Sequence, residues 1–154
     1  MSGNERNGWQ KYLIDDSRSI RKLLSETRRI AVLGIKPEQQ ASQPAFYVPQ
    51  YMAAAGYEII PVPVYFPDLQ AVLGQTVYRR VSDIPGEVDL VNVFRRPHDI
   101  NQHIEDIIAK RPKAVWFQSG IRNDDAAEIF ARAGILVVQD RCLMIEHRRL
   151  NFAR

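Results

Sequence analysis

Three cationic side chains follow apolar segments of this sequence: Lys36, Arg95 and Arg96. Lys36 comes two residues after an apolar run that ends at Gly34, and the two arginines directly follow a second run, 88–94. Continuous apolar runs of this kind are typical of strands buried on both faces of a parallel sheet. Cations at the carboxyl edge of such a sheet can bind an anionic ligand, although an arginine there can equally be a solvated charge at the rim.

A sheet is needed to position these cations, and the sequence predicts one. Strands are expected at 29–34, 57–62, 88–94, 113–118 and 135–140, with a short edge strand at 77–79. Helical periodicity is expected at 17–27, 46–54, 100–108, 124–133 and 141–150, and short turns of helix at 68–73 and 82–86. Pro49 predicts a kink or a start near Val48, because an internal proline costs a helix about 3 kcal/mol.

The alternation of these strands with helices predicts the fold class. It indicates right-handed crossovers and one α/β domain, a three-layer, doubly wound, Rossmann-like arrangement with a mostly parallel sheet of five or six strands. We expect residues 28–154 to form this domain and the N-terminal segment 1–27 to be helical and to pack on it. Trp9 and Leu13 suit a short leading helix, and Ser17 is the predicted N-cap of the next one.

The composition narrows the class of protein. The 154 residues are 45% hydrophobic and 25% charged, and no apolar run approaches the roughly 18 residues of a membrane span. We see no signal-peptide pattern, and the single cysteine, Cys142, excludes an internal disulfide, so we expect a cytoplasmic protein with no membrane partner. The net charge of +3 lies in short basic pairs rather than in a stripe, which disfavours a nucleic-acid partner.

The loop after the first predicted strand tests for a dinucleotide site. A NAD fingerprint needs three glycines in the pattern G-x-G-x-x-G and an acid at the end of the second strand. The chain has Gly34 alone, and its second strand ends Val62-Pro63-Val64. NAD is therefore disfavoured, whereas another phosphate-bearing nucleotide remains compatible with the loop.

A longer ordered set of residues carries a resemblance to a known family. The set comprises Ile30–Gly34, Phe46-Tyr47-Val48, Gly56-Tyr57, Ile60–Pro63, Asp83-Ile84-Pro85, Val93–Arg96, Trp116–Gly120 and Asp140–His147. It resembles the small stand-alone CoA-binding proteins, whose fold is similar to the CoA-binding domain of the succinyl-CoA synthetase α subunit. The resemblance covers residues 28–147, nearly the whole folded part of the chain.

The resemblance implies that coenzyme A binds at the carboxyl edge of the sheet. The residues that it implies should hold phosphates are Gly34, Ile35, Lys36, Gln43 and Pro44. Those that it implies should border the nucleotide are Val62, Pro63, Phe94, Arg95 and Arg96, with Gln118, Ser119 and Gly120 beside it. The chain departs from the family at Lys36, where a small hydroxyl residue is usual, and at Pro61-Val62-Pro63-Val64, where the family has Pro-Val-Asn-Pro.

Two classes of function remain open. The first, which the resemblance implies, is non-catalytic binding of CoA or an acyl-CoA by a carrier, sensor or subunit, with a protein partner possible. The alternative is an enzyme that acts with an acyl-CoA or an NAD(P)-type nucleotide. Such an enzyme needs a general acid or base at the rim of the site, and no residue there has a compelling neighbour in the sequence.

The histidines and the cysteine carry weaker signals. The spacing of His98, His103, His147 and Cys142 matches no compact metal site, and Cys142 and His147 are too far apart on a helix to form a nucleophile pair. Cys142 is expected to pack as a small hydrophobe. The alternative is a thiolate, favoured by Arg141 and by a helix beginning there, that lies near the ligand and exchanges with a disulfide of CoA.

Overall fold

The structure is a computed structural model that describes residues 8–152, so the first seven residues of the expected N-terminal segment lie outside the described residues. Within the described part, five parallel strands form one sheet of order β2-β1-β5-β6-β7. Their bounds are β1 (Arg29–Leu33), β2 (Glu58–Val62), β5 (Leu90–Val93), β6 (Ala114–Phe117) and β7 (Leu136–Val138). The predicted doubly wound, Rossmann-like α/β fold is confirmed, and every pairing in this sheet is parallel.

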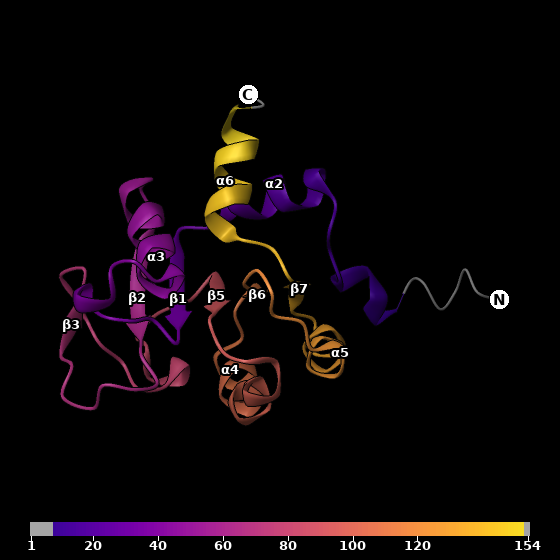
Figure 1. Cartoon of the computed structure of the whole chain (residues 1–154). Helices are drawn as coiled ribbons and strands as arrows, with labels where there is room; N and C mark the ends of the chain where they lie inside the picture. The colour runs from indigo at the N-terminus through magenta and orange to yellow at the C-terminus, as the bar shows by residue number, and fades with distance from the viewer. Residues whose placement is uncertain (1–7, 153–154) are drawn as a thin grey trace.

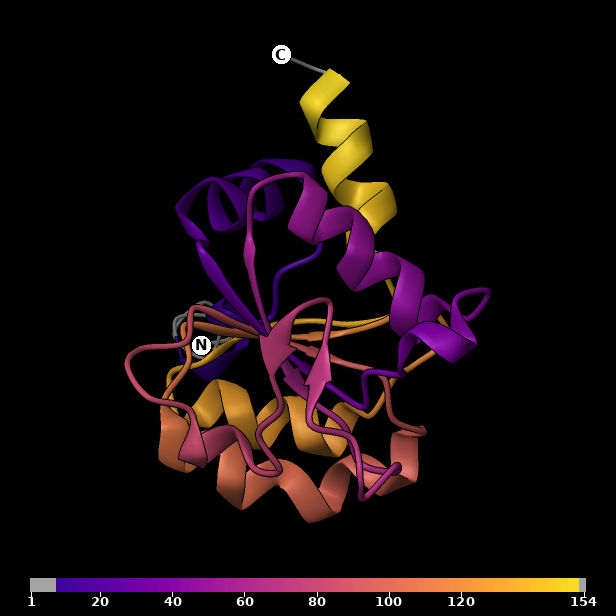
Figure 2. The same ribbon diagram turned by 90° about the vertical axis from the view of Figure 1, so that its left-hand side faces the viewer.

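Helices cover both faces of the sheet (Figure 1). One face carries α2 (Ser17–Glu26), α3 (Pro44–Ala54) and α6 (Leu143–Phe152), and the other carries α4 (Ile104–Lys110) and α5 (Asp124–Arg132). Figure 2 shows the same three layers from the side of β2. Short 3-10 helices are η1 (Trp9–Tyr12), η2 (Glu38–Gln40), η3 (Val81–Asp83) and η4 (Pro97–His103).

The apolar strands supply both cores, because successive side chains of a strand point to opposite faces. Ile30 and Trp116 pack in the cluster beneath α2, α3 and α6, whereas Ala31 and Phe117 pack in the cluster above α4 and α5. All four are fully buried. Burial on both faces explains why these strands read as continuous apolar runs rather than as alternating ones.

The region between β2 and β5 corrects two predictions. The expected edge strand at 77–79 and the expected helical turns at 68–73 are both wrong. Instead, β3 (Ala71–Val72) and β4 (Gln75–Thr76) form a small antiparallel hairpin. Its turn residues Leu73 and Gly74 both have positive φ, 53° and 74°, as the favoured two-residue hairpin turn requires. A leucine in this conformation is not a turn signal, so the pattern concealed the hairpin.

The N-terminal segment reaches the far edge of the sheet before α2 begins. Leu13 forms a single parallel bridge with Val137 of β7, and the backbone N–H of Ile14 donates to the carbonyl oxygen of Val137 at 3.0 Å. Asp16, rather than the predicted Ser17, is the N-cap of α2, and its carboxylate accepts a hydrogen bond from the Ser19 backbone N–H at 3.0 Å. The segment therefore covers the outer edge of β7 as well as contributing a helix.

Candidate functional site

The strand order places the topological switch point of the sheet between β1 and β5, and we call the region between the loops that follow these two strands the crevice. These neighbours in the sheet are separated in sequence, and the chain leaves β1 through α3 on one face and β5 through η4 and α4 on the other (Figure 1). Because the two connections diverge, the loops after these strands part at the carboxyl edge. Open α/β sheets bind their ligands at this topological switch point.

Gly34 joins the two loops at the base of the crevice. Its φ is +89°, and an ideal Cβ built on it would lie 2.3 Å from the carbonyl oxygen of Phe94. Its N–H donates to the carbonyl oxygen of Val62 at 2.8 Å. Three predicted site residues therefore meet here through their backbones, and only glycine fits at the meeting point.

The loop after β1 is fixed to α3 by an unusual bond. Pro49 lies inside α3, which begins at Pro44 and not near Val48, and it has no N–H to donate to the carbonyl of Ala45. That carbonyl instead accepts from the backbone N–H of Lys36 at 3.1 Å. The internal proline thus frees an acceptor that holds the predicted phosphate loop against the start of the helix.

Two more predicted residues lie at the start of α3. The Lys36 ammonium approaches the Gln43 side-chain oxygen at 3.5 Å, and Gln43 occupies the N-cap position. No side chain in the described part of the chain caps this first turn. Lys36 is thus a partly buried cation beside an uncapped helix start, and its neighbour Ile35 is fully buried. These residues form one wall of the crevice, and this wall suits an anion.

Arg95 forms the other wall and is held on two sides. Only 9% of the residue is exposed. Its Nε donates to Nε2 of His103 at 3.1 Å, its Nη1 donates to the Tyr65 hydroxyl at 3.4 Å, and the guanidinium lies 5.7 Å from the centre of the Tyr65 ring. The third nitrogen, Nη2, has no hydrogen-bond partner among residues 8–152. It is not fully buried, so it reaches solvent.

Arg96 differs from its neighbour Arg95 in exposure and in its partner. Its side chain is 83% exposed and pairs with Asp99 through an Nε–Oδ2 contact of 2.9 Å. The hydrogen bond from Arg96 is the main reason that the pKa of Asp99 lies below its usual value. Arg96 is the N-cap residue of η4, and in this structure its exposed side chain pairs with the first turn of that helix.

Gln118 connects the site to α6 from inside the protein. Its side-chain oxygen accepts from Nδ2 of Asn92 at 3.2 Å and from the backbone N–H of Leu143 at 3.3 Å. The next two predicted residues, Ser119 and Gly120, are exposed, and the Gly120 N–H donates to the Asp140 carboxylate at 2.7 Å. Gln118 therefore fixes the loop that presents these two residues.

The sequence interpretation missed Asn92. It is fully buried in β5, and its Oδ1 lacks a hydrogen-bond partner among the described residues. Its Nδ2 contacts Gln118 and the carbonyl oxygen of Trp116. A lone amide inside an otherwise apolar strand was the available signal, because a buried polar side chain needs partners nearby.

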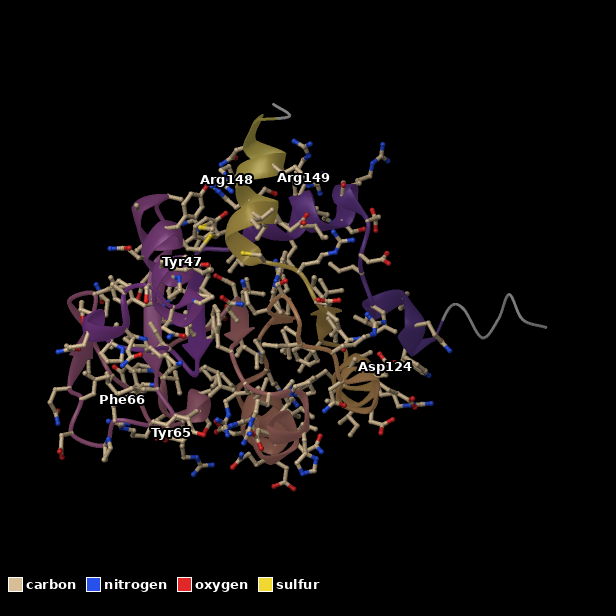
Figure 3. The ribbon with its side chains drawn as sticks, in the orientation of Figure 1. Tyr47, Tyr65, Phe66, Asp124, Arg148 and Arg149 are labelled. Atoms are coloured by element: carbon tan, nitrogen blue, oxygen red, sulfur yellow. The ribbon has the colours of Figure 1, made fainter. Side chains whose placement is uncertain are left out.

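The sequence interpretation also missed the contacts that hold the loop after β2 in place. Phe66 has a φ of 63°, and one guanidinium, that of Arg79, donates to the carbonyl oxygens of residues 65, 66, 67 and 69 at 2.8–3.3 Å. Figure 3 shows Tyr65 and Phe66 at one end of the molecule, far from Asp124 of α5 at the other. A hollow of about 430 Å³ lies here, lined by Pro37, Gln39, Phe66, Pro67, Asp68 and Leu69. The prolines predicted only an end to strand pairing, whereas Arg79 builds a fixed loop.

Pro63, the remaining predicted border residue, is buried directly after β2, and its side chain is apolar.

The described residues contain no group of three or more His, Cys, Asp or Glu side chains placed to hold a metal ion. Within the same residues, no helix is long and apolar enough to cross a membrane.

The structure is a doubly wound α/β domain with the cationic side chains of Lys36 and Arg95 in the loops at its switch point. The chain belongs to the CoA binding domain family, whose sequence model matches residues 28–148. The resemblance inferred from the sequence is thereby confirmed.

Individual relatives cover nearly the same part of the chain. The uncharacterized protein YneT of Bacillus subtilis strain 168 is 31% identical over 128 residues, which are 83% of this chain and 91% of YneT. Among solved structures, cell-free ID.343 from Thermus thermophilus gives a TM-score of 0.81 at 39% identity over 88% of this chain and 99% of its own. A hypothetical protein from Pyrococcus horikoshii OT3 gives a TM-score of 0.80 at 34% identity over 89% of this chain and 93% of its own.

Proposed function

We propose that this protein binds coenzyme A, free or as an acyl-CoA, in the crevice between β1 and β5, and that it acts without catalysis as a carrier, sensor or subunit. Membership of the CoA binding domain family supports the ligand class. The crevice fits such a ligand because cations stand on both of its walls, and the diphosphate of CoA is an anion.

The observation that carries the proposal is the guanidinium of Arg95. Two of its nitrogens are held by protein side chains, and the third reaches solvent within two residues of the Gly34–Phe94 contact. An arginine held in one orientation loses little entropy when it binds a phosphate, and each charge-assisted hydrogen bond is strong. Lys36 on the opposite wall supplies a second charge where the family usually has a hydroxyl.

The other proposed contacts follow from the loops on each side. Gly34, Ile35, Gln43 and Pro44 present backbone around the phosphates, beside the uncapped start of α3. The apolar hollow next to the loop after β2 suits the base, together with Val62, Pro63 and Phe94. Ser119 and Gly120, fixed through Gln118, border the pantetheine arm on the side of α6.

Titration calorimetry with CoA, NAD and NADP tests the proposal on the purified full chain. We expect CoA to bind and to raise the melting temperature, because a ligand at 100 times its Kd stabilises the folded state by about 2.7 kcal/mol. NAD and NADP should not bind, since Gly34 stands alone in its loop and β2 ends without an acid. Comparable binding of NAD, or no binding of CoA, would overturn the proposal.

A second experiment separates the binding module from the enzyme. Native mass spectrometry of the protein purified without added ligand should detect CoA or acyl-CoA bound at one equivalent. Incubation with acetyl-CoA should leave the thioester intact over hours at pH 8, matched against buffer alone. Turnover of the thioester by this chain would instead establish the enzyme alternative.

A further inference from the structure

Arg95 and its two partners form a polar cluster at the ligand edge that we call the arginine clamp: Arg95, His103 and Tyr65. The three come from different parts of the chain, the loop after β5, the end of η4 and the loop after β2. His103 is half-buried, and Tyr65 is 60% exposed. Arg95 is therefore the most buried member of the clamp, and it is held by one half-buried and one exposed partner.

The clamp fixes the protonation state of His103. A guanidinium has only donors, so the Nε2 atom that receives the Arg95 Nε–H at 3.1 Å must carry a lone pair. The imidazole ring is then neutral, with its proton on Nδ1. A protonated ring has two donors and a positive charge, and it would face the guanidinium as a like charge.

We propose that His103 and Tyr65 are positioning residues that hold Arg95 for the phosphates of CoA, and that tight binding requires a neutral His103. This inference rests on the proposed function. It adds that the affinity depends on two side chains outside the predicted ligand set and that the affinity falls in weak acid.

The surroundings of His103 favour the neutral ring at pH 7. Burial is the main cause that lowers the pKa of His103 below 6.5, and the Arg95 charge lowers it further. The carboxylates of Asp106 and Asp99 act in the opposite direction. Each carboxylate has a cationic partner of its own, Arg80 on Asp106 at 3.5 Å and Arg96 on Asp99, and the Tyr65 hydroxyl contacts the other side of Arg95.

The sign of the pH effect follows from this lowered pKa. At pH 8 the ring is neutral in the folded and in the unfolded protein, and the clamp is intact. As the pH falls through the lowered pKa of folded His103, the ring gains a proton and the bond from Arg95 is lost. The affinity of the protein for CoA should therefore be constant from pH 8 to about 6.5 and should fall below that range.

The test measures the Kd by calorimetry between pH 8 and pH 5 for the wild type, His103→Gln and His103→Ala. Dephospho-CoA is titrated beside CoA, because the terminal phosphate of CoA itself loses charge near pH 6. A glutamine oxygen accepts from Arg95 at every pH, so His103→Gln should bind as tightly as wild type at pH 8 and keep a flat profile for dephospho-CoA. His103→Ala should bind about fivefold more weakly at pH 8, the effect of one lost hydrogen bond.

Two further variants separate positioning from a general effect on folding. Tyr65→Phe keeps the ring beneath the guanidinium and removes the hydroxyl, so it should weaken binding by about two- to threefold. The double variant Arg95→Ala with His103→Ala should bind no more weakly than Arg95→Ala alone, because His103 acts only through Arg95. Circular dichroism at each pH verifies that every variant is folded.

Each outcome decides between the two proposals. If the wild type binds CoA at pH 8 but His103→Gln shows the same acid loss as wild type with dephospho-CoA, the positioning role is wrong while the function stands. The positioning role is equally wrong if His103→Ala binds CoA as tightly as wild type. If the folded wild type binds CoA at no pH, the proposed function fails and the clamp has no ligand to position.

Discussion

The two edges of the sheet differ in how they use their charged groups. The amino edge holds the larger hollow, about 620 Å³ against about 430 Å³ at the carboxyl edge. Two charged side chains there bind the backbone: one carboxylate oxygen of Asp89 accepts the N–H groups of both Arg28 and Arg29 at 2.9 Å, and the Arg29 guanidinium donates to the carbonyls of Pro85 and Glu87.

At the carboxyl edge, the guanidinium of Arg95 is held by side chains and keeps one nitrogen for solvent. We therefore place the proposed ligand site by a fixed donor with unused capacity and not by the size of a hollow. Substitutions at the amino edge should therefore change stability alone, whereas those at the carboxyl edge should change ligand binding.

Gly34→Ala should have the largest effect. The new Cβ meets a backbone oxygen at 2.3 Å, at a φ of +89°, so both loops of the crevice must move. We expect a loss of about 3–5 kcal/mol in the free energy of unfolding, measured by urea denaturation, with CoA binding lost. The matched control is Gly56→Ala beside the amino edge, where φ is +105° and nothing lies within 4 Å of the new Cβ. It should cost about 1–2 kcal/mol and leave binding intact; equal losses would remove the difference between the edges.

Arg95→Ala should weaken CoA binding by about 1.5–3 kcal/mol, the scale of charge-assisted hydrogen bonds in a partly buried site. Arg96→Ala is the control, because its side chain is 83% exposed and already paired with Asp99. It should change the affinity by less than about 0.5 kcal/mol. Calorimetric titration of both variants decides, and the reverse ranking would move the ligand from the crevice wall to the rim.

Asp89→Asn should affect the amino edge only. The amide loses the charge that strengthens two backbone hydrogen bonds from Arg28 and Arg29. We expect the free energy of unfolding to fall by about 1–2 kcal/mol in urea denaturation while the Kd for CoA stays at its wild-type value. A lower affinity for CoA in the fully folded variant would instead show that the amino edge contributes to ligand binding.

The sequence indicated the sheet well because its strands are buried on both faces. Runs such as 29–34 and 113–118 are apolar throughout their centres, and short runs of this kind, repeated between helical segments, are typical of a parallel sheet. The hairpin of β3 and β4 was missed because its strands have only two residues each and its turn contains Leu73 at positive φ. Tertiary contacts stabilise such a turn, among them the bond from the Leu73 N–H to the Glu38 carboxylate at 2.9 Å.

The candidate site was predictable only where it follows strands directly. Gly34, Lys36 and Arg95 lie within a few residues of a strand end, so the topology places them. Tyr65 also lies close behind a strand, but nothing in its type or spacing predicts its contact with Arg95, and His103 lies at the far end of η4. A local pattern gives the edge at which a residue lies but not the partner that its side chain selects.

Substitution of Cys142 should have the smallest effect on CoA binding. It tests whether the carboxyl edge binds its ligand by charge alone. Its side chain is half-buried and packs against the core beneath α2, α3 and α6, as its apolar neighbours predicted. Hydrogen bonds to two backbone carbonyls fix this turn: that of Cys142 accepts from the Glu146 backbone N–H at 3.0 Å, and that of Arg141 accepts from the Trp116 indole N–H at 2.7 Å.

Cys142→Ser should therefore bind CoA with the wild-type Kd, and wild type incubated with oxidised CoA should show no added mass. Exchange would require the Cys142 thiolate to attack the CoA disulfide, forming a protein–CoA disulfide and releasing one CoA thiolate. A half-buried thiol that packs against the core is poorly placed for that in-line attack. Intact-mass spectrometry with and without reductant provides the measurement. One equivalent of reducible adduct, absent from the serine variant, would place the thiol beside the ligand and add covalent capture to the chemistry of this edge.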